Sequence, residues 1–202
     1  MRLLAVTAVA AEADAVRAGV DSTGSTVDTV VAGIGPAAAA AATSAALAAD
    51  RYDVVVSAGI AGGFDIPLGT VVVASRIVAA DLGVETADGF EPIGVTALDV
   101  PAELVARFAA PTRAITGAVL SVSTVTGTAV TTAALLARHP DAVAEAMEGF
   151  GVATAAAWHG VPFAEIRTIS NTVGPRNRAS WRIPEALHAL TEAFAAITKE
   201  PL

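Results

Sequence analysis

Short apolar runs alternate with alanine-rich segments along almost the whole chain, and this alternation limits the folds open to it. The apolar runs predict buried strands at residues 3–9, 26–32, 54–57, 71–78, 115–122, 142–147 and 162–169. The segments between them predict helices at residues 12–18, 37–49, 101–110, 129–138, 149–159 and 184–199. We therefore expect an α/β fold, a three-layer αβα sandwich around a twisted, mixed and largely parallel central sheet. A length of 202 residues predicts a single domain over residues 1–202.

One segment breaks the alternation. Residues 81–100 are polar and contain Asp81, Glu85, Asp88 and Glu91 together with glycines. Glycines and charged residues without an apolar period are typical of loops, so we expect an extended loop here.

The composition excludes several classes of function. The chain has no Cys and only 3 His, with no close His pair, so we predict no disulfide and no metal site, and we expect no cofactor. A formal net charge of -8 repels polyphosphate backbones and anionic lipid surfaces. We therefore expect neither nucleic acid nor a membrane as partner, and the remaining candidate is a small molecule.

The N-terminal run has two interpretations. Arg2 and the apolar residues 3–11 imitate a signal peptide, with Ala8-Val9-Ala10 as its cleavage site. We favour a buried first strand, because the run is short and a single Arg is a weak basic region. Mean hydropathy is high at +0.62, but every apolar run breaks before the roughly 18 residues that a membrane helix needs. We expect a soluble, cytoplasmic protein.

Three polar residues stand where an apolar run ends. Glu12 follows the first run, Glu148 follows residues 142–147, and Asn171 follows residues 162–169. Because ligands bind at the carboxyl ends of strands in open α/β sheets, we expect Glu148 and Asn171 to face one pocket. A carboxylate and a two-sided amide suit a hydroxylated ligand with a heterocycle. For Glu12, a general base and a solvated carboxylate at a helix start both stay open.

Two glycine-containing segments follow predicted strands. Gly33-Ile34-Gly35 precedes Pro36 and lacks the third glycine of a dinucleotide fingerprint, so it predicts either a strand-to-helix turn or a cradle of backbone N–H groups. Residues 57–63 contain three glycines after a buried strand, which allows a ligand to approach the backbone closely. We expect binding at the second segment.

Five motifs in a fixed order carry a family resemblance: AVAAE at 8–12, AGIG at 32–35, SAGIAGG at 57–63, AME at 146–148 and RTISN at 167–171. Over nearly its whole length the chain resembles the purine nucleoside phosphorylase and nucleosidase superfamily. Within it, SNTVGPR at 170–176 and SWRI at 180–183 are most similar to the futalosine hydrolase branch. The resemblance implies hydrolysis of the N-ribosidic bond of futalosine, which releases hypoxanthine and dehypoxanthine futalosine in an alternative menaquinone pathway.

The resemblance also implies residue roles. Glu12 falls at the glutamate that activates water, and Met147 and Glu148 fall at ribose contacts. Asn171 falls where adenine-directed members carry an aspartate; its amide can donate to O6 of a 6-oxopurine and accept from a protonated N7. Because Asn171 has no acidic proton, the proton for N7 must come from solvent or another group. The other expected substrate-binding residues are Gly35, Ala61, Gly62, Ser170, Arg176 and Arg182.

Two interpretations are open for the arginines that follow Asn171. Futalosine carries a benzoate, which the planar fork of Arg176, Arg178 or Arg182 can bind while Trp181 packs on its ring. The alternative is a solvated loop anchored by Trp181. The superfamily often carries a purine-stacking aromatic near Val125, and this chain has none there.

Three rival functions stay open. A phosphorylase needs basic residues at a phosphate site, and neither glycine-containing segment has one suited to that role, while Glu12 repels phosphate. A methylthioadenosine or adenosylhomocysteine nucleosidase has Asn171 as the feature against it. A noncatalytic nucleoside-binding module has Glu12 and Glu148 against it. Members of the superfamily often complete the pocket across a dimer interface, so we expect a homo-oligomer, a dimer or an assembly of dimers.

Overall fold

The fold is a mixed sheet with helices on two sides. We analysed a computed structural model, which describes residues 1–23 and 25–199. The strands and helices in chain order are β1 (Leu3–Thr7), α1 (Ala10–Asp21), β2 (Asp28–Val31), α2 (Pro36–Ala49), β3 (Val54–Gly63), β4 (Val71–Ala79), β5 (Gly83–Thr86), β6 (Gly89–Pro92), β7 (Ala97–Asp99), α3 (Ala102–Thr112), β8 (Ile115–Ser121), α4 (Ala129–Arg138), β9 (Ala142–Ala146), α5 (Gly149–Trp158), β10 (Phe163–Thr172), the 3₁₀ turn η1 (Arg178–Ser180) and α6 (Ile183–Thr198). The predicted domain also included residues 24 and 200–202, which lie outside the described residues.

The sheet closes on itself. Its strand order is β10-β4-β8-β9-β3-β1-β2, and β10 pairs with β3 as well as with β4. The strands β3, β9, β8, β4 and β10 therefore form a ring, while β1 and β2 extend from β3 as an open wing. The predicted α/β class with a mixed sheet is confirmed. The open sheet that we expected is not observed, because β10 pairs with both β3 and β4, and β3 is long enough to pair with β1 near its start and with β9 at its end.

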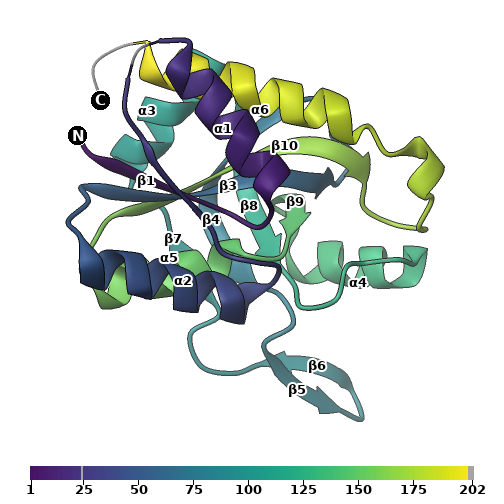
Figure 1. Cartoon of the computed structure of the whole chain (residues 1–202). Coiled ribbons are helices and arrows are strands. Elements are labelled where there is room, and N and C mark those ends of the chain that lie inside the picture. Colours follow the sequence, from purple (N-terminus) through teal and green to yellow (C-terminus); the bar gives the residue numbers. More distant parts are fainter. Residues whose placement is uncertain (24, 200–202) are drawn as a thin grey trace.

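Helices cover the sheet in two groups. Helix α1 packs beside α6, and α2 packs beside α5 on the other side, as Figure 1 shows. Pro36 begins α2, as predicted, because a missing N–H costs nothing at the first helical position. The core between the layers is built from Val, Leu, Ile and Ala of the strands, with Phe108 and Phe194 from α3 and α6 fully buried.

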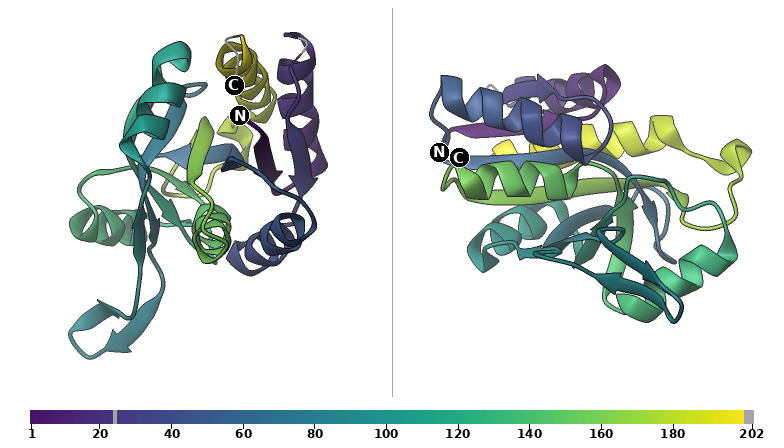
Figure 2. Two further views of the ribbon diagram at one scale, coloured as in Figure 1. Left: turned by 90° about the vertical axis from the view of Figure 1, so that its left-hand side faces the viewer. Right: turned by 90° about the horizontal axis from the view of Figure 1, so that it is seen from below.

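Two predicted segments differ from the structure. The strand predicted at residues 54–57 is longer, since β3 runs on through the glycines to Gly63 and its end also pairs with β9. Glycines allow this close approach of three strands because they carry no side chain. Residues 81–100 are not a loop: β5 and β6 form a hairpin, which projects from the body (Figure 2), and β7 pairs with β4. Their short, exposed strands lack the apolar run that marks a buried strand.

Gly151 allows α2 and α5 to approach closely. A Cβ at this position would overlap the backbone carbonyl of Pro36. We predict that Gly151→Ala lowers the free energy of unfolding by about 1–3 kcal/mol, because the backbones must separate to admit a methyl group. Ala157→Ser, at an exposed position of the same helix, is the control and should change it by less than about 0.5 kcal/mol. Equal urea midpoints for Gly151→Ala and the wild type would contradict this packing.

Candidate active site

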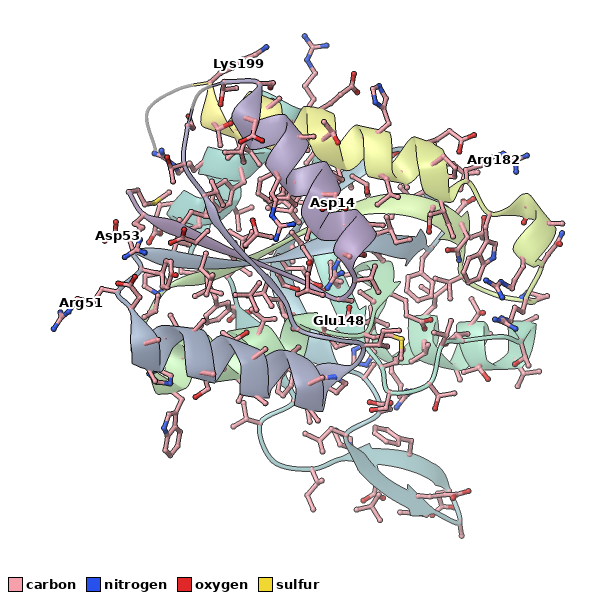
Figure 3. The ribbon with its side chains drawn as sticks, viewed as in Figure 1. Asp14, Arg51, Asp53, Glu148, Arg182 and Lys199 are labelled. Carbon is pink, nitrogen blue, oxygen red and sulfur yellow. The ribbon has the colours of Figure 1, made fainter. Side chains whose placement is uncertain are left out.

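A cavity of about 270 Å³ opens where β3, β9 and β10 end and α1 begins. Most of the residues that the sequence placed at the site line it: Glu12, Ala61, Gly62, Met147, Glu148, Ser170, Asn171 and Arg176. Figure 3 shows Glu148 in the middle of the molecule, below the helix that carries Asp14. The structure thus brings together residues that are up to 164 positions apart, from Glu12 to Arg176.

Two expected residues lie outside the cavity lining. Gly35 has a positive φ of 93°, which favours glycine, and its N–H donates to Oε1 of Glu148 over 3.1 Å. Arg182 is exposed, and in Figure 3 its side chain points away from Glu148. Its guanidinium donates to backbone carbonyls of Ala179 and Trp181. Gly35 therefore contacts a residue of the cavity, Glu148, whereas Arg182 is not among the residues that line it.

Backbone N–H groups fix the Glu12 carboxylate. Glu12 lies in the first turn of α1 and is 4% exposed. Its Oε2 accepts from the N–H groups of Ala8 and Val9 at 3.0 and 3.2 Å, and its Oε1 accepts from Ile60 at 2.9 Å. Three donors from two segments hold a carboxylate in one orientation, which a positioned proton acceptor requires.

Gly59 makes room for this carboxylate. A Cβ at Gly59 would overlap Oε1 of Glu12 and would lie 2.8 Å from Nη1 of Arg167. The glycine in the middle of β3 therefore lets two charged side chains pack against the strand backbone.

Arg167 is the most important residue that the sequence reasoning did not place at the site. It is 1% exposed in the middle of β10. Its Nε donates to Oε1 of Glu165 at 2.8 Å, and its Nη2 donates to Oγ of Ser57 at 2.9 Å and lies 3.4 Å from Oε2 of Glu148. Glu165 and Arg167 thus form a buried ion pair within one strand. The ion pair of Arg167 with Glu148 could not be predicted from the sequence, because it depends on how β10 packs against the start of α5.

The charges around Arg167 shift two pKa values. Burial lowers the pKa of Arg167, but the carboxylates of Glu165, Glu148 and Glu12 outweigh it and raise this pKa above its ordinary value. Burial raises the pKa of Glu165 against the opposing effect of Arg167, and Glu148 adds to the increase. Oε2 of Glu165 has no hydrogen-bond partner among the described residues, and it lies against Gly149.

Glu145 lines the cavity together with Glu12 and Glu148, and the sequence did not indicate it as a site residue. It lies on β9 and is buried. Its Oε1 accepts from the N–H of Thr126 at 2.9 Å, and its Oε2 contacts the hydroxyl of Thr126. Burial raises the pKa of Glu145, the hydrogen bonds from Thr126 oppose this, and the charge of Asp81 adds to it. A Glu inside an apolar strand run was the available signal.

A β-bulge turns two neighbouring residues of β10 toward the cavity. The pairing of β10 with β3 shifts between Ile169 and Asn171, so Ser170 is the extra residue. In a regular strand Ser170 and Asn171 would face opposite sides; here both line the cavity. The Ser170 hydroxyl contacts Oδ1 of Asn171 at 2.8 Å, and Nδ2 of Asn171 donates to the carbonyl of Thr172 at 3.1 Å.

A cation and an aromatic ring line the cavity next to each other. Arg176 and Trp181 both line it, and the Arg176 guanidinium lies 5.9 Å from the centre of the Trp181 ring. Arg178 lies 5.7 Å from the same ring and does not line the cavity. Val125 also lines it and is 44% exposed.

Within residues 1–23 and 25–199, no three His, Cys, Asp or Glu side chains are grouped as a metal site would need. Over the same residues, no helix has the length and apolar character of a membrane span.

The closed mixed sheet, with carboxylates at its strand ends, belongs to a known family. The model of the phosphorylase superfamily matches residues 10–201, and the chain is a member of this superfamily. The fold agrees with that of a methylthioadenosine/adenosylhomocysteine nucleosidase from Neisseria meningitidis in complex with methylthio-immucillin-A, with a TM-score of 0.86 over 98% of both chains at 20% identity.

Curated relatives narrow the family. The chain is 53% identical to a futalosine hydrolase from Streptomyces coelicolor, over 98% of this chain and 95% of the relative. It is 46% identical to a futalosine hydrolase from Acidothermus cellulolyticus, over 98% of this chain and 90% of the relative. Within the superfamily the chain belongs to the futalosine hydrolases.

Loss of Arg167 should be costly. Arg167→Met leaves Glu148 and Glu165 buried without their cation, so we predict a loss of about 3–5 kcal/mol in the free energy of unfolding. Arg17→Met removes an exposed ion pair with Asp14 and should cost less than about 1 kcal/mol. Denaturant unfolding of both variants tests this difference, and equal midpoints would show that the ion pairs of Arg167 with Glu148 and Glu165 do not stabilise the fold.

Proposed function

We propose that the protein hydrolyses the N-ribosidic bond of futalosine, and that three sets of residues in its cavity bind the ribose, the base and the benzoate of this substrate. The observation that carries this proposal is the pair of fixed, buried carboxylates, Glu12 and Glu148, on one cavity that also presents the Asn171 amide. Water attack at an anomeric carbon needs a base, sugar contacts and a leaving group that is stabilised as it gains electrons.

Glu12 is the general base in this proposal. Its carboxylate is held by three N–H groups and borders the cavity, so a water bound to it can lose a proton as it attacks C1′. The product sugar then carries the water oxygen at C1′.

Glu148 and Met147 hold the ribose. The Glu148 carboxylate is positioned by the Gly35 N–H and by Arg167, and a carboxylate accepts hydrogen bonds from two adjacent hydroxyl groups. Ala61 and Gly62 present backbone and little side chain to the cavity, which leaves room for the substrate.

Asn171 recognises the base. Its Nδ2 donates to O6 of a 6-oxopurine and its Oδ1 accepts from N7–H of the leaving base. Ser170 supports the amide through its contact with Oδ1. Adenine presents a donor at position 6, which opposes the donor of the amide; this supports a 6-oxopurine over methylthioadenosine.

Arg176 and Trp181 bind the benzoate end. They line the cavity together, and an arginine fork beside an aromatic ring suits an aromatic carboxylate. The exposed position of Arg182 supports Arg176 as the carboxylate ligand.

Charge favours water over phosphate as the nucleophile. Among the described residues that line the cavity, Arg176 is the single basic one, and it is exposed beside Trp181. Arg167 is already engaged by Glu165 and Glu148. A phosphate beside Glu12 would meet like charge without a cation to balance it.

We also propose that the protein works as a homo-oligomer built on a dimer, in the cytoplasm. Exposed apolar side chains around the cavity support a partner surface there: Val9, Ile34 and Val125 are 41%, 65% and 44% exposed. Contiguous exposed apolar residues of this kind are typical of protein interfaces.

The proposal is tested with futalosine, inosine and methylthioadenosine, each incubated separately with the purified protein while free base is followed by chromatography. We expect hypoxanthine from futalosine at a far higher rate than from inosine. Adenine release from methylthioadenosine would overturn the role of Asn171. Tight binding of futalosine without base release would support a binding module instead.

Glu12→Gln should lower kcat for futalosine by about 10²- to 10⁴-fold with little change in substrate binding, because the amide cannot accept the proton of water. Asp14→Asn, an exposed carboxylate on the same helix, is the matched control and should retain wild-type turnover. Steady-state kinetics measures the effect. A kcat within two- to threefold of wild type, about 0.5 kcal/mol, would show that Glu12 is not the base.

Arg176→Met should raise the KM for futalosine by roughly tenfold or more, the effect of losing a charged hydrogen bond of about 1.5–3 kcal/mol. The KM for inosine, which has no benzoate, should not change. Arg182→Met is the matched control and should leave both values unchanged. If Arg182→Met raises the futalosine KM and Arg176→Met does not, the benzoate lies outside this cavity.

A further inference from the structure

The proposed reaction lacks a proton donor. When the N-ribosidic bond breaks, its electron pair moves onto the purine, which leaves more easily when a proton reaches N7. Asn171 faces that region and has no acidic proton. Glu12 must be deprotonated to act as a base, so it cannot supply the proton at the same time. This inference rests on the proposed hydrolysis and concerns the group that completes it.

The strand pairing places Glu145 and Asn171 on either side of Gly62. Asn171 of β10 pairs with Gly62 of β3, and Gly62 pairs in turn with Glu145 of β9. Paired residues on neighbouring strands point to the same face of a sheet. Asn171 and Glu145 therefore lie on the same face, one on each side of Gly62. With strands about 4.8 Å apart, their backbones are separated by roughly 10 Å. Asn171 leans over this glycine, since its Nδ2 would lie 3.1 Å from a Cβ at Gly62.

The surroundings of Glu145 differ from those of the other two carboxyl groups on the cavity. Glu148 lies 3.4 Å from a guanidinium nitrogen of Arg167, and the charge of Glu12 acts on the same arginine. Among the ion pairs of residues 1–23 and 25–199, none includes Glu145. Its partner is the neutral Thr126, and burial raises its pKa. A carboxyl group that is buried without a cation favours the protonated form.

We propose that Glu145, whose Oε2 contacts the Thr126 hydroxyl, is the general acid that protonates the leaving base. Both residues line the cavity, and a hydroxyl can accept one proton while it donates another. Asn171 then orients the base from one side of Gly62 by donating from its Nδ2 to O6, and Glu145 delivers the proton to N7 from the other side.

The protons balance over one turnover. Water forms the bond to C1′ and gives one proton to Glu12, while the C1′–N9 electron pair moves onto the purine. N7 takes the proton of Glu145, so hypoxanthine leaves as a neutral base. Glu12 then loses a proton to solvent and Glu145 regains one, so that futalosine and one water yield hypoxanthine and the free sugar.

Glu145→Gln tests the proposal, because the amide keeps the contacts to Thr126 and cannot release a proton. We expect kcat for futalosine to fall by about 10²- to 10⁴-fold. Glu103→Gln, an exposed carboxylate in the first turn of α3, is the matched control and should retain wild-type kcat. Glu145→Asp keeps an acid and should recover part of the loss.

A pH profile separates an acid from a structural residue. The acid form of Glu145 is present below its pKa, so wild-type kcat should fall as pH rises through this pKa, and Glu145→Gln should lack that alkaline limb. The ionisable groups that act on Glu145 or share its cavity are Asp81, Glu12, Glu148 and Arg176. Asp81→Asn should keep the alkaline limb and move it to lower pH, because a neighbouring negative charge raises the pKa.

A substrate with an activated leaving group provides the second readout. An analogue that carries 4-nitrophenolate in place of hypoxanthine needs no protonation, so Glu145→Gln should cleave it at close to the wild-type rate. A similar loss on both substrates, or an unchanged alkaline limb, would overturn the acid role while wild-type hydrolysis of futalosine stands. Absence of base release from futalosine by the wild type would overturn the proposed function itself.

Discussion

The buried guanidinium of Arg167 is the interaction on which the site depends. Carboxylates are costly to bury, and Glu12, Glu148 and Glu165 are all buried within reach of its charge. Arg167 contacts two of them and the hydroxyl of Ser57, so it links β10, β3 and the start of α5. The same interaction therefore stabilises the fold and fixes the position of the carboxylate that is proposed to hold the ribose.

Glycines make room for the buried carboxyl groups around Arg167. Side chains at Gly59 or Gly149 would overlap the carboxyl groups of Glu12 or Glu165. Gly62 stands between Asn171 and Glu145 and leaves that part of the cavity face without a side chain. The glycine-rich end of β3 thus pairs with two strands, closes the sheet and leaves room for a ligand. All three follow from the absence of side chains at its glycines.

The sequence predicted the parts of the site that depend on local pattern. Glu12, Glu148 and Asn171 stand at the ends of apolar runs, and this position brought all three to the cavity. The α/β class and most elements followed from the alternation of runs and alanine-rich segments. Arg167 and Glu145 were missed because they lie inside runs that read as plain strands. Their significance comes from partners such as Ser57, which is 110 positions from Arg167. Closure of the sheet and the bulge at Ser170 depend on pairing between distant strands, for which a single sequence has no periodic signal.

The central claim is that water, and not phosphate, cleaves futalosine at this cavity. The most direct measurement is the rate of hypoxanthine release from futalosine in phosphate-free buffer and again with added phosphate, with the sugar product identified by mass spectrometry. The account predicts the same rate in both buffers and dehypoxanthine futalosine as the sugar product. A rate that requires phosphate, with a sugar 1-phosphate as product, would contradict it and would make the enzyme a phosphorylase.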